Sequence, residues 1–392
     1  MKLEAIRVTR FDRCDAGATG TQSATTSFAI EDALRCVDNV DYMIQAKAGE
    51  HDRLLASIFG ISSIWAYSDT NTVARVMHRH AGIPWNETVR VQAANPALLT
   101  DTAAYVVQSE DRRLCVLCFP GADFFANAIQ WFTTISSRPE PFRAAGHVHG
   151  GFFRGLMLLA ATLQTLLQSA RKGGSICEAV ARERAIWNDC GKEAPRCSED
   201  DPGPLGADSG TSHGVLRPPR EDGPDVLEAL YITGHSLGGA LAVIMAALLF
   251  EDPRLAYFRE KLRGVYTYGQ PMVGYQDFKD RFERDLGKML FRHVYRNDSI
   301  PRLPAWTMGP FVHFGSLYRS EEGKGWVPSR TLTPQSCTLV GSVLTGVLSW
   351  FFQEMLVGLS VVPLLPPGIS YADHLPLYYL RASEAEAGVT FT

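Results

Sequence analysis

The sequence predicts an α/β protein with a mostly parallel central sheet flanked by helices. The first observation is size and composition: 392 residues, of which 46% are hydrophobic and 20% charged, are enough to bury a large core. The second is that apolar runs of strand length alternate with helical periodicity from Leu227 onward. Strands that alternate with helices imply right-handed crossovers and parallel pairing. In chain order the expected elements are a strand at 229–233, a helix at 239–250, a strand at 262–268, a helix at 276–286 and a strand at 290–295.

The part of the chain before this alternation divides into three segments. Residues 1–97 contain helix-like stretches without a catalytic pattern, and we expect an N-terminal helical cap region there, with the main domain spanning 98–392. Two apolar runs at 103–108 and 114–119, separated by a polar turn, predict a hairpin. A helix is expected at 153–172 because its apolar residues recur at helical spacing.

Residues 173–225 differ in composition from the chain on both sides. Ten of the 26 residues from Asp200 to Asp225 are Pro or Gly, and large apolar side chains are nearly absent. Such a segment cannot bury enough surface to offset its ordering entropy. We expect a disordered insertion at 173–225 within one domain.

Charge and cysteine content exclude several classes of function. The formal net charge is −4 and no long basic run is present, so no nucleic-acid partner is expected. Charged residues interrupt the N-terminus too often for a secretory signal, which favours a cytoplasmic protein or one exported without such a signal. Cys115 and Cys118 form a CxxC within an apolar strand, where residues three apart point to opposite faces. They are expected in the core, and no metal or cofactor is implied.

The sharpest motif is Gly234-His235-Ser236-Leu237-Gly238. An apolar strand precedes it and an apolar helix follows, which is the strand, sharp turn and helix that a nucleophile elbow requires. A lone serine hydroxyl is a weak nucleophile, so Ser236 needs a histidine base oriented by a carboxylate further along the chain. Asp298 directly follows a predicted strand and suits the acid, while spacing alone leaves both His313 and His374 open as the base.

Several segments in the same order resemble the class 3 lipase family of α/β-hydrolases. The resembling segments are Phe119-Pro-Gly-Ala122, Asn127 to Trp131, Val148-His-Gly-Gly-Phe152, the serine motif, Tyr266-Thr-Tyr-Gly-Gln-Pro271 and Asn297-Asp-Ser-Ile-Pro-Arg-Leu-Pro304. The resemblance implies that His374 is the general base and that His313 is structural. It also implies that the backbone N–H groups of Ala122 and Leu237 bind the oxyanion, that His149 supports the site, and that His235 packs against the strand ends.

Two departures from the family pattern bear on activity. The family carries Ser or Thr where this chain has Ala122, so the hydroxyl that assists the oxyanion is missing. Loss of one oxyanion donor costs about a hundredfold to a thousandfold in rate unless another group replaces it. The interval from Gly121 to Trp131 is also longer than usual, and within it lie the expected lid and substrate-binding residues Phe124, Phe125, Ile129 and Trp131.

A second apolar segment runs from Leu339 to Val362. Ser342, Thr345, Ser349 and Gln353 make one narrow polar stripe, which favours an amphipathic helix at 339–356 that presents Trp350 and Phe351 to substrate or lipid. A buried core helix and a membrane span are the alternatives, and Glu354 within the segment argues against a span.

These features predict a serine hydrolase that cleaves carboxylic esters of fatty acids, an acylglycerol lipase or esterase, through an acyl-enzyme. The partner is then a lipid or ester substrate at an interface, with peripheral membrane contact and no obligate protein partner. The alternatives are a phospholipase A1 or acyltransferase with the same triad, and a catalytically weak lipase-like binding protein.

Overall fold

The computed structural model describes residues 1–7, 38–95, 100–122, 138–143, 145–190, 224–330, 370 and 372–387. Their centre is a nine-stranded sheet with the order β1-β2-β3-β4-β7-β8-β9-β10-β11. The strands are β1 (Lys2–Arg7), β2 (Glu87–Asn95), β3 (Thr100–Gln108), β4 (Leu114–Phe119), β7 (Ala229–His235), β8 (Leu262–Tyr268), β9 (Leu290–Tyr295), β10 (Ser316–Ser320) and β11 (Val327–Ser329). Strands β5 (Pro139–Pro141) and β6 (His147–His149) form a separate pair.

The middle of the sheet is parallel and its edges are antiparallel. Strands β4, β7, β8, β9 and β10 pair in parallel, whereas β1 to β4 form an antiparallel meander and β11 pairs antiparallel with β10. The predicted strands at 229–233, 262–268 and 290–295 are confirmed, as is the hairpin of β3 and β4. This is the sheet of an α/β-hydrolase, and the ends of β4, β7 and β9 bring the candidate site residues to one edge.

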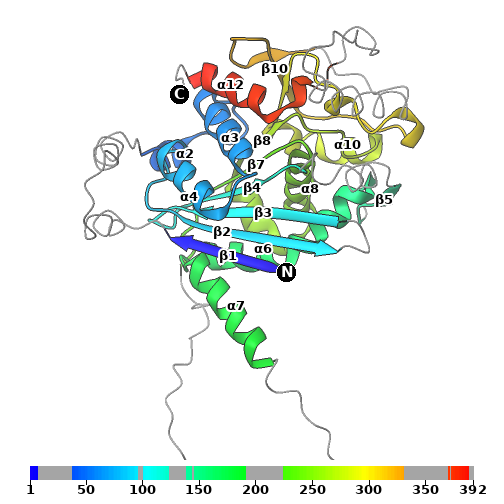
Figure 1. Cartoon of the computed structure of the whole chain (residues 1–392). Coiled ribbons are helices and arrows are strands. Elements are labelled where there is room, and N and C mark those ends of the chain that lie inside the picture. Colours follow the sequence, from blue (N-terminus) through cyan, green and yellow to red (C-terminus); the bar gives the residue numbers. More distant parts are fainter. Residues whose placement is uncertain are drawn as a thin grey trace, which may run out of the picture.

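Helices cover both faces of the sheet (Figure 1). On one face α6, α7, α8, α9 and α10 share a core with inward side chains such as Leu230 and Ile232. On the other face α2, α3, α4 and α12 pack around Tyr231, which lies between those two residues on the same strand. The helices are α2 (Val40–Gln45), α3 (Arg53–Trp65), α4 (Thr70–Arg79), α6 (Gly150–Arg171), α7 (Ile176–Cys190), α8 (Leu237–Glu251), α9 (Ala256–Lys261), α10 (Gln276–Phe282) and α12 (Pro376–Ala387).

The expected division between a helical cap at 1–97 and a domain at 98–392 differs from the structure. Strands β1 and β2 lie in the first part yet belong to the central sheet, and β2 pairs with β3 across the expected boundary. The helices α3 and α4 pack on this sheet instead of forming a separate unit. The alternating pattern of Lys2-Leu-Glu-Ala-Ile-Arg7 was compatible with such an edge strand.

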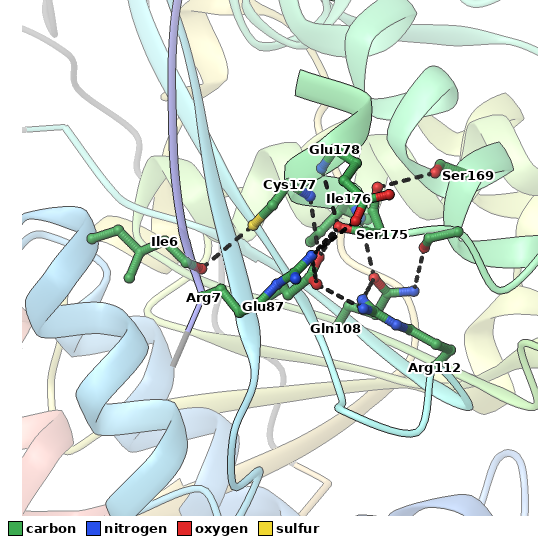
Figure 2. Close-up of polar contacts among 11 residues, drawn as sticks. Ile6, Arg7, Glu87, Gln108, Arg112, Ser169, Ser175, Ile176, Cys177 and Glu178 are labelled. Atoms are coloured by element: carbon green, nitrogen blue, oxygen red, sulfur yellow. Dashed lines mark hydrogen bonds and ion pairs between the residues drawn. The ribbon is translucent and has the colours of Figure 1, made fainter. Parts of the chain in front are cut away.

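The expectation of disorder at 173–225 is wrong for its first residues, because a buried carboxylate anchors them (Figure 2). Glu87 on β2 is 2% exposed and accepts from Arg7, Arg112, the Ser175 hydroxyl and the Cys177 backbone N–H, at 2.7, 2.7, 2.7 and 3.1 Å. Burial alone would raise the pKa of the Glu87 carboxyl. The hydrogen bonds from its donors, above all Arg112 and Ser175, have a larger effect and lower this pKa from 4.5 to about 2. The Ser175 hydroxyl also accepts from the Glu178 N–H at 3.0 Å, which caps the first turn of α7.

The other end of this segment is anchored too. Asp225 accepts from Arg171 at 2.7 and 2.8 Å and forms an ion pair with Lys172 at 3.1 Å. Residues 173–190 and 224–225 therefore belong to the folded body, and 191–223 lie outside the described residues.

Two further expectations concern apolar helices. The helix predicted at 153–172 is α6, which is long and apolar enough to cross a membrane, yet 61% of its most apolar window is buried within the fold. It is thus a core helix by its contacts. The segment 339–362, with Trp350 and Phe351, lies outside the described residues.

Candidate active site

Ser236 occupies a strained turn between β7 and α8. Its φ of 56° and ψ of −127° are rare for a residue with a side chain. The turn closes only because its neighbours lack side chains: a Cβ on Gly234 would lie 2.4 Å from the carbonyl carbon of Gly238, and one on Gly238 would lie 2.0 Å from the Phe119 carbonyl oxygen. The backbone thus presents the hydroxyl at the end of the sheet, as the motif predicted.

A continuous hydrogen-bonded chain links Ser236 to His374 and Asp298. The Nε2 atom of His374 lies 2.8 Å from Ser236 Oγ, and its Nδ1 atom lies 2.7 Å from Asp298 Oδ2. Asp298 follows β9, and His374 ends a single turn of 3₁₀ helix just before α12. All three side chains are buried. The structure therefore brings the three predicted residues together in the order that nucleophilic catalysis requires.

The segment that carries His374 is fastened to the acid loop. The Ser370 N–H donates to the Asn297 carbonyl at 2.9 Å, and the Ser299 N–H donates to the Ser370 carbonyl at 3.2 Å. Asp373 accepts from the Asn297 N–H at 3.1 Å. These bonds hold the imidazole and the carboxylate in a fixed relative position.

Two donors besides His374 hold the Asp298 carboxylate. The Ile300 N–H donates to Oδ1 at 2.8 Å, and the Tyr379 hydroxyl donates to Oδ2 at 2.5 Å while it accepts from the Tyr295 N–H at 3.1 Å. Burial and the charge of Asp298 raise the pKa of Tyr379 well above its ordinary value, so the hydroxyl stays a donor. Tyr379 was not predicted from the sequence; its only signal is its place one turn beyond His374.

His313, the other candidate base, is bonded to the loop that carries Asp298. Its Nε2 atom donates to the Pro301 carbonyl at 2.7 Å, and burial followed by the charge of Arg292 holds its pKa well below 6.5. A neutral ring bonded in this way supports the loop that carries Asp298. The geometry thus separates the two histidines that spacing left open.

His235 contacts the base from the side. Its ring stacks on that of His374 with 4.8 Å between centroids, and its Nδ1 atom lies 2.9 Å from the Tyr67 hydroxyl. Burial, with a smaller effect of His374, keeps its pKa well below 6.5, so the ring is neutral. His149 caps the first turn of α6, and its ring stacks on that of Phe152.

The predicted oxyanion residues flank the elbow. Leu237 begins α8, so its N–H has no acceptor within the helix. Ala122 follows β4, which pairs in parallel with β7 so that Phe119 lies opposite Gly234. Two backbone N–H groups from adjacent strand ends can therefore converge beside Ser236. The lid residues Phe124, Phe125, Ile129 and Trp131 lie outside the described residues.

The remaining candidate features of the described residues are metal-ligand clusters and cysteines. No group of three or more His, Cys, Asp or Glu side chains among them could hold a metal ion. Cys115 and Cys118 are free and buried, one in each core, and burial raises the pKa of the Cys115 thiol to about 12. The prediction that both are core residues is confirmed.

Comparison with known proteins points to one family. Residues 220–308 match the sequence model of the family described as lipase (class 3). A triacylglycerol lipase of Ricinus communis is 27% identical over 319 residues, which cover 76% of this chain and 56% of that protein. A triacylglycerol lipase of Nicotiana tabacum is 35% identical over a stretch that covers 38% of this chain and 30% of that protein. A lipase of Rhizopus niveus is 26% identical over a stretch that covers 62% of this chain and 46% of that protein.

The chain thus spans about half or less of the length of these curated relatives. Among solved structures, the Rhizomucor miehei lipase propeptide complex is 18% identical with a TM-score of 0.46, covering 83% of this chain and 80% of that one. The family match includes Ser236 and Asp298, and the hydrogen-bonded chain adds His374. Residues 220–308, which carry Ser236 and Asp298, are therefore similar to the class 3 lipase family.

Proposed function

We propose that this protein is a serine hydrolase that cleaves carboxylic esters of fatty acids. The observation that carries the proposal is the chain of hydrogen bonds from Ser236 through His374 to Asp298, at the end of an α/β-hydrolase sheet. Relatives named triacylglycerol lipase or lipase support the substrate class.

The geometry gives each residue one task in forming the acyl-enzyme. His374 Nε2 accepts the Ser236 proton as Oγ attacks the ester carbonyl, and Asp298 holds the proton on Nδ1 and stabilises the imidazolium. The carbonyl oxygen becomes an oxyanion that accepts from the N–H groups of Ala122 and Leu237. Collapse of this intermediate breaks the ester C–O bond, and His374 gives its proton to the departing alcohol.

The second half of the cycle uses the same groups. His374 takes a proton from water, the resulting hydroxide attacks the acyl carbon, and Ser236 recovers the proton as the fatty acid leaves. Tyr379 and the Ile300 N–H keep the Asp298 carboxylate oriented through both halves. The substrate is a lipid ester at an interface, because the apolar segments around the predicted lid and at 339–362 would favour lipid.

Labelling with an alkyl fluorophosphonate tests the proposal directly. The parent protein should be labelled at Ser236 and should hydrolyse p-nitrophenyl butyrate, while Ser236→Ala should do neither. Labelling without turnover would favour the lipase-like binding protein. Acyl transfer to an added alcohol in place of water would favour the acyltransferase, and release of one chain from a phospholipid would favour phospholipase A1.

A further inference from the structure

A pocket of about 430 Å³ lies at the end of α12 away from the catalytic histidine, and the proposed ester hydrolysis does not use it. Its walls come from the start of α3, from β10 and β11, and from the last turn of α12. This volume is within the range of small-molecule sites. We propose that the pocket binds a neutral alcohol with a short apolar body. The side chains that carry the argument are His51, Arg53, Tyr318, Trp326, Val327 and Glu386.

The pocket is separate from the catalytic triad. The Trp326 ring stacks on that of Tyr379, with 5.9 Å between centroids, and the Tyr379 hydroxyl donates to Asp298. The pocket thus lies behind the side chain that holds the catalytic acid. Binding there needs no reaction at Ser236.

The protonation of two neighbouring histidines determines what one wall offers to a ligand. His293 Nδ1 lies 3.1 Å from the Thr267 carbonyl oxygen, which can only accept, so this nitrogen carries the proton of that ring. Burial holds the pKa of His293 well below 6.5, so the ring is neutral and its Nε2 atom carries no proton. His51 Nε2, which lies 3.2 Å from His293 Nε2, must therefore be the donor of their hydrogen bond.

The other nitrogen of His51 is then a hydrogen-bond acceptor. Burial, opposed most by the charge of Glu386, lowers the pKa of His51 from 6.5 to about 4, so the ring is neutral at pH 7. A neutral imidazole with its proton on Nε2 has a lone pair on Nδ1, and this Nδ1 has no hydrogen bond to any of the described residues. The ring stacks on Tyr318 with 3.6 Å between centroids, which fixes its orientation.

Another wall supplies a hydrogen-bond donor. Trp326 is 3% exposed, and its indole Nε1 has no hydrogen-bond partner within the described part of the chain. The backbone N–H of Trp326 donates to Glu386 at 2.6 Å, which holds the residue in place. A buried N–H without a partner is unfavourable, so an acceptor that enters the pocket gains a hydrogen bond there. A hydroxyl is the smallest group that can accept from this indole and donate to His51 Nδ1.

The charges of the walls cancel, which favours a neutral ligand. Arg53 Nε lies 2.6 Å from Glu386 Oε1, and the side chain of Glu386 is fully buried. These two are the ionised side chains among the residues that line the pocket, since His51 is neutral. A carboxylate or an ammonium group would lose its hydration without meeting a net opposite charge. A hydroxyl loses less and finds both of its partners.

Apolar surface beside these polar groups favours an alcohol over water. Val327 on β11 lines the pocket and is 57% exposed. The stacked rings of His51 and Tyr318 also line it. A ligand with a few methylene groups would remove this surface from water, which stabilises the complex in proportion to the apolar area covered.

Titration of the parent protein with hexan-1-ol, followed by NMR of the indole N–H groups, tests the site directly. The chain has seven tryptophans, and Trp326→Phe identifies the signal of Trp326. This signal should move to higher frequency and saturate, because the N–H gains an acceptor. Hexanoate and hexylammonium should bind about tenfold more weakly than hexan-1-ol, since each carries a charge that the pocket does not balance.

Three variants distinguish binding in the pocket from binding elsewhere. Val327→Phe fills the pocket from an exposed position and should abolish the shift of the Trp326 signal. Met157→Phe places the same ring on α6, where Met157 is 45% exposed, and should leave the shift unchanged. His51→Gln keeps an N–H toward His293 Nε2 but removes the Nδ1 acceptor, so the dissociation constant should rise about tenfold.

Three results would overturn the proposal. The first is a Trp326 signal that hexan-1-ol does not move, because water would then be the only ligand of the pocket. The second is a charged hexyl compound that binds as tightly as the alcohol, and the third is a Val327→Phe protein that keeps the shift. The titration of the parent decides the matter even if a variant fails to fold. No readout requires ester hydrolysis, so a protein inactive on esters would still show the shift, and a missing shift would leave the proposed function untouched.

Discussion

Replacing Glu87 by glutamine should destabilise the protein at neutral pH and much less in acid. The carboxylate lies among two arginines, the Ser175 hydroxyl and the Cys177 N–H, and is 2% exposed (Figure 2). Its pKa falls from 4.5 to about 2, because these donors outweigh the effect of burial. At 1.36 kcal/mol for each pKa unit, this difference contributes roughly 3 kcal/mol to the free energy of unfolding.

The sign follows from the lowered pKa in the folded state. The contribution is complete above about pH 4.5 and is lost as the pH falls toward about 2, because the unfolded chain then binds a proton that the folded chain does not. Urea unfolding of the parent and of Glu87→Gln between pH 7 and pH 3 measures the difference. We expect the free energy of unfolding of the variant to be lower by roughly 3 kcal/mol at pH 7, and this difference to decrease below about pH 4.5.

Glu178→Gln is the matched control. Glu178 also faces Arg7, at 3.4 Å, but its side chain is 68% exposed, so its loss should change the unfolding free energy by less than about 1 kcal/mol. A gap for Glu87→Gln that stays constant from pH 7 to pH 3 would refute the electrostatic reasoning. A loss of unfolding free energy in Glu87→Gln no larger than that in Glu178→Gln would refute the expected magnitude of the Glu87 contribution.

Three more predictions concern the site. Asp298→Asn and His374→Ala should each lower ester turnover by orders of magnitude, with folding intact by circular dichroism. His313→Ala should keep most of the turnover. The reverse result for the two histidines would show that His313 is the base. Tyr379→Phe removes the 2.5 Å donor to Asp298 and should lower kcat about tenfold or more on dissolved esters, and an unchanged kcat would show that the Ile300 N–H suffices. Trp350→Ser with Phe351→Ser should reduce hydrolysis of emulsified long-chain esters more than that of dissolved short-chain esters, and equal losses with a lowered melting temperature would favour a buried core helix.

The elements around the nucleophile were predictable because local pattern and tertiary structure agree there. The buried runs 229–233, 262–268 and 290–295 have the length and composition of parallel strands, and all three are strands in the structure. Asp298 and Ser236 follow from chain order and from the elbow motif. His374 could be preferred over His313 only through the family resemblance, because no local rule distinguishes a base from a loop support.

The parts that were missed depend on contacts between residues far apart in sequence. Composition suggested disorder from 173 onward, yet Glu87, some 88 residues earlier, supplies the partner that orders the start of α7. Tyr379 carries no motif of its own, and its contact with Asp298 appears only when α12 lies beside the end of β9. The N-terminal strands were missed because β1 is a short edge strand with charged residues, a pattern that also suits exposed chain.

The close packing of α3 against α12 determines how far this protein can be shortened and still fold. Gly60 on α3 faces the Ser383 side chain so closely that any Cβ would collide with it, and the Ser57 hydroxyl donates to the Ser383 carbonyl at 2.6 Å. Arg53 and Glu386 join the same helices at 2.6 Å. Expressing residues 98–392 alone would expose this face of α12 and remove the surface on which Tyr379 is held. Engineers who wish to shorten the protein should therefore keep residues 38–95.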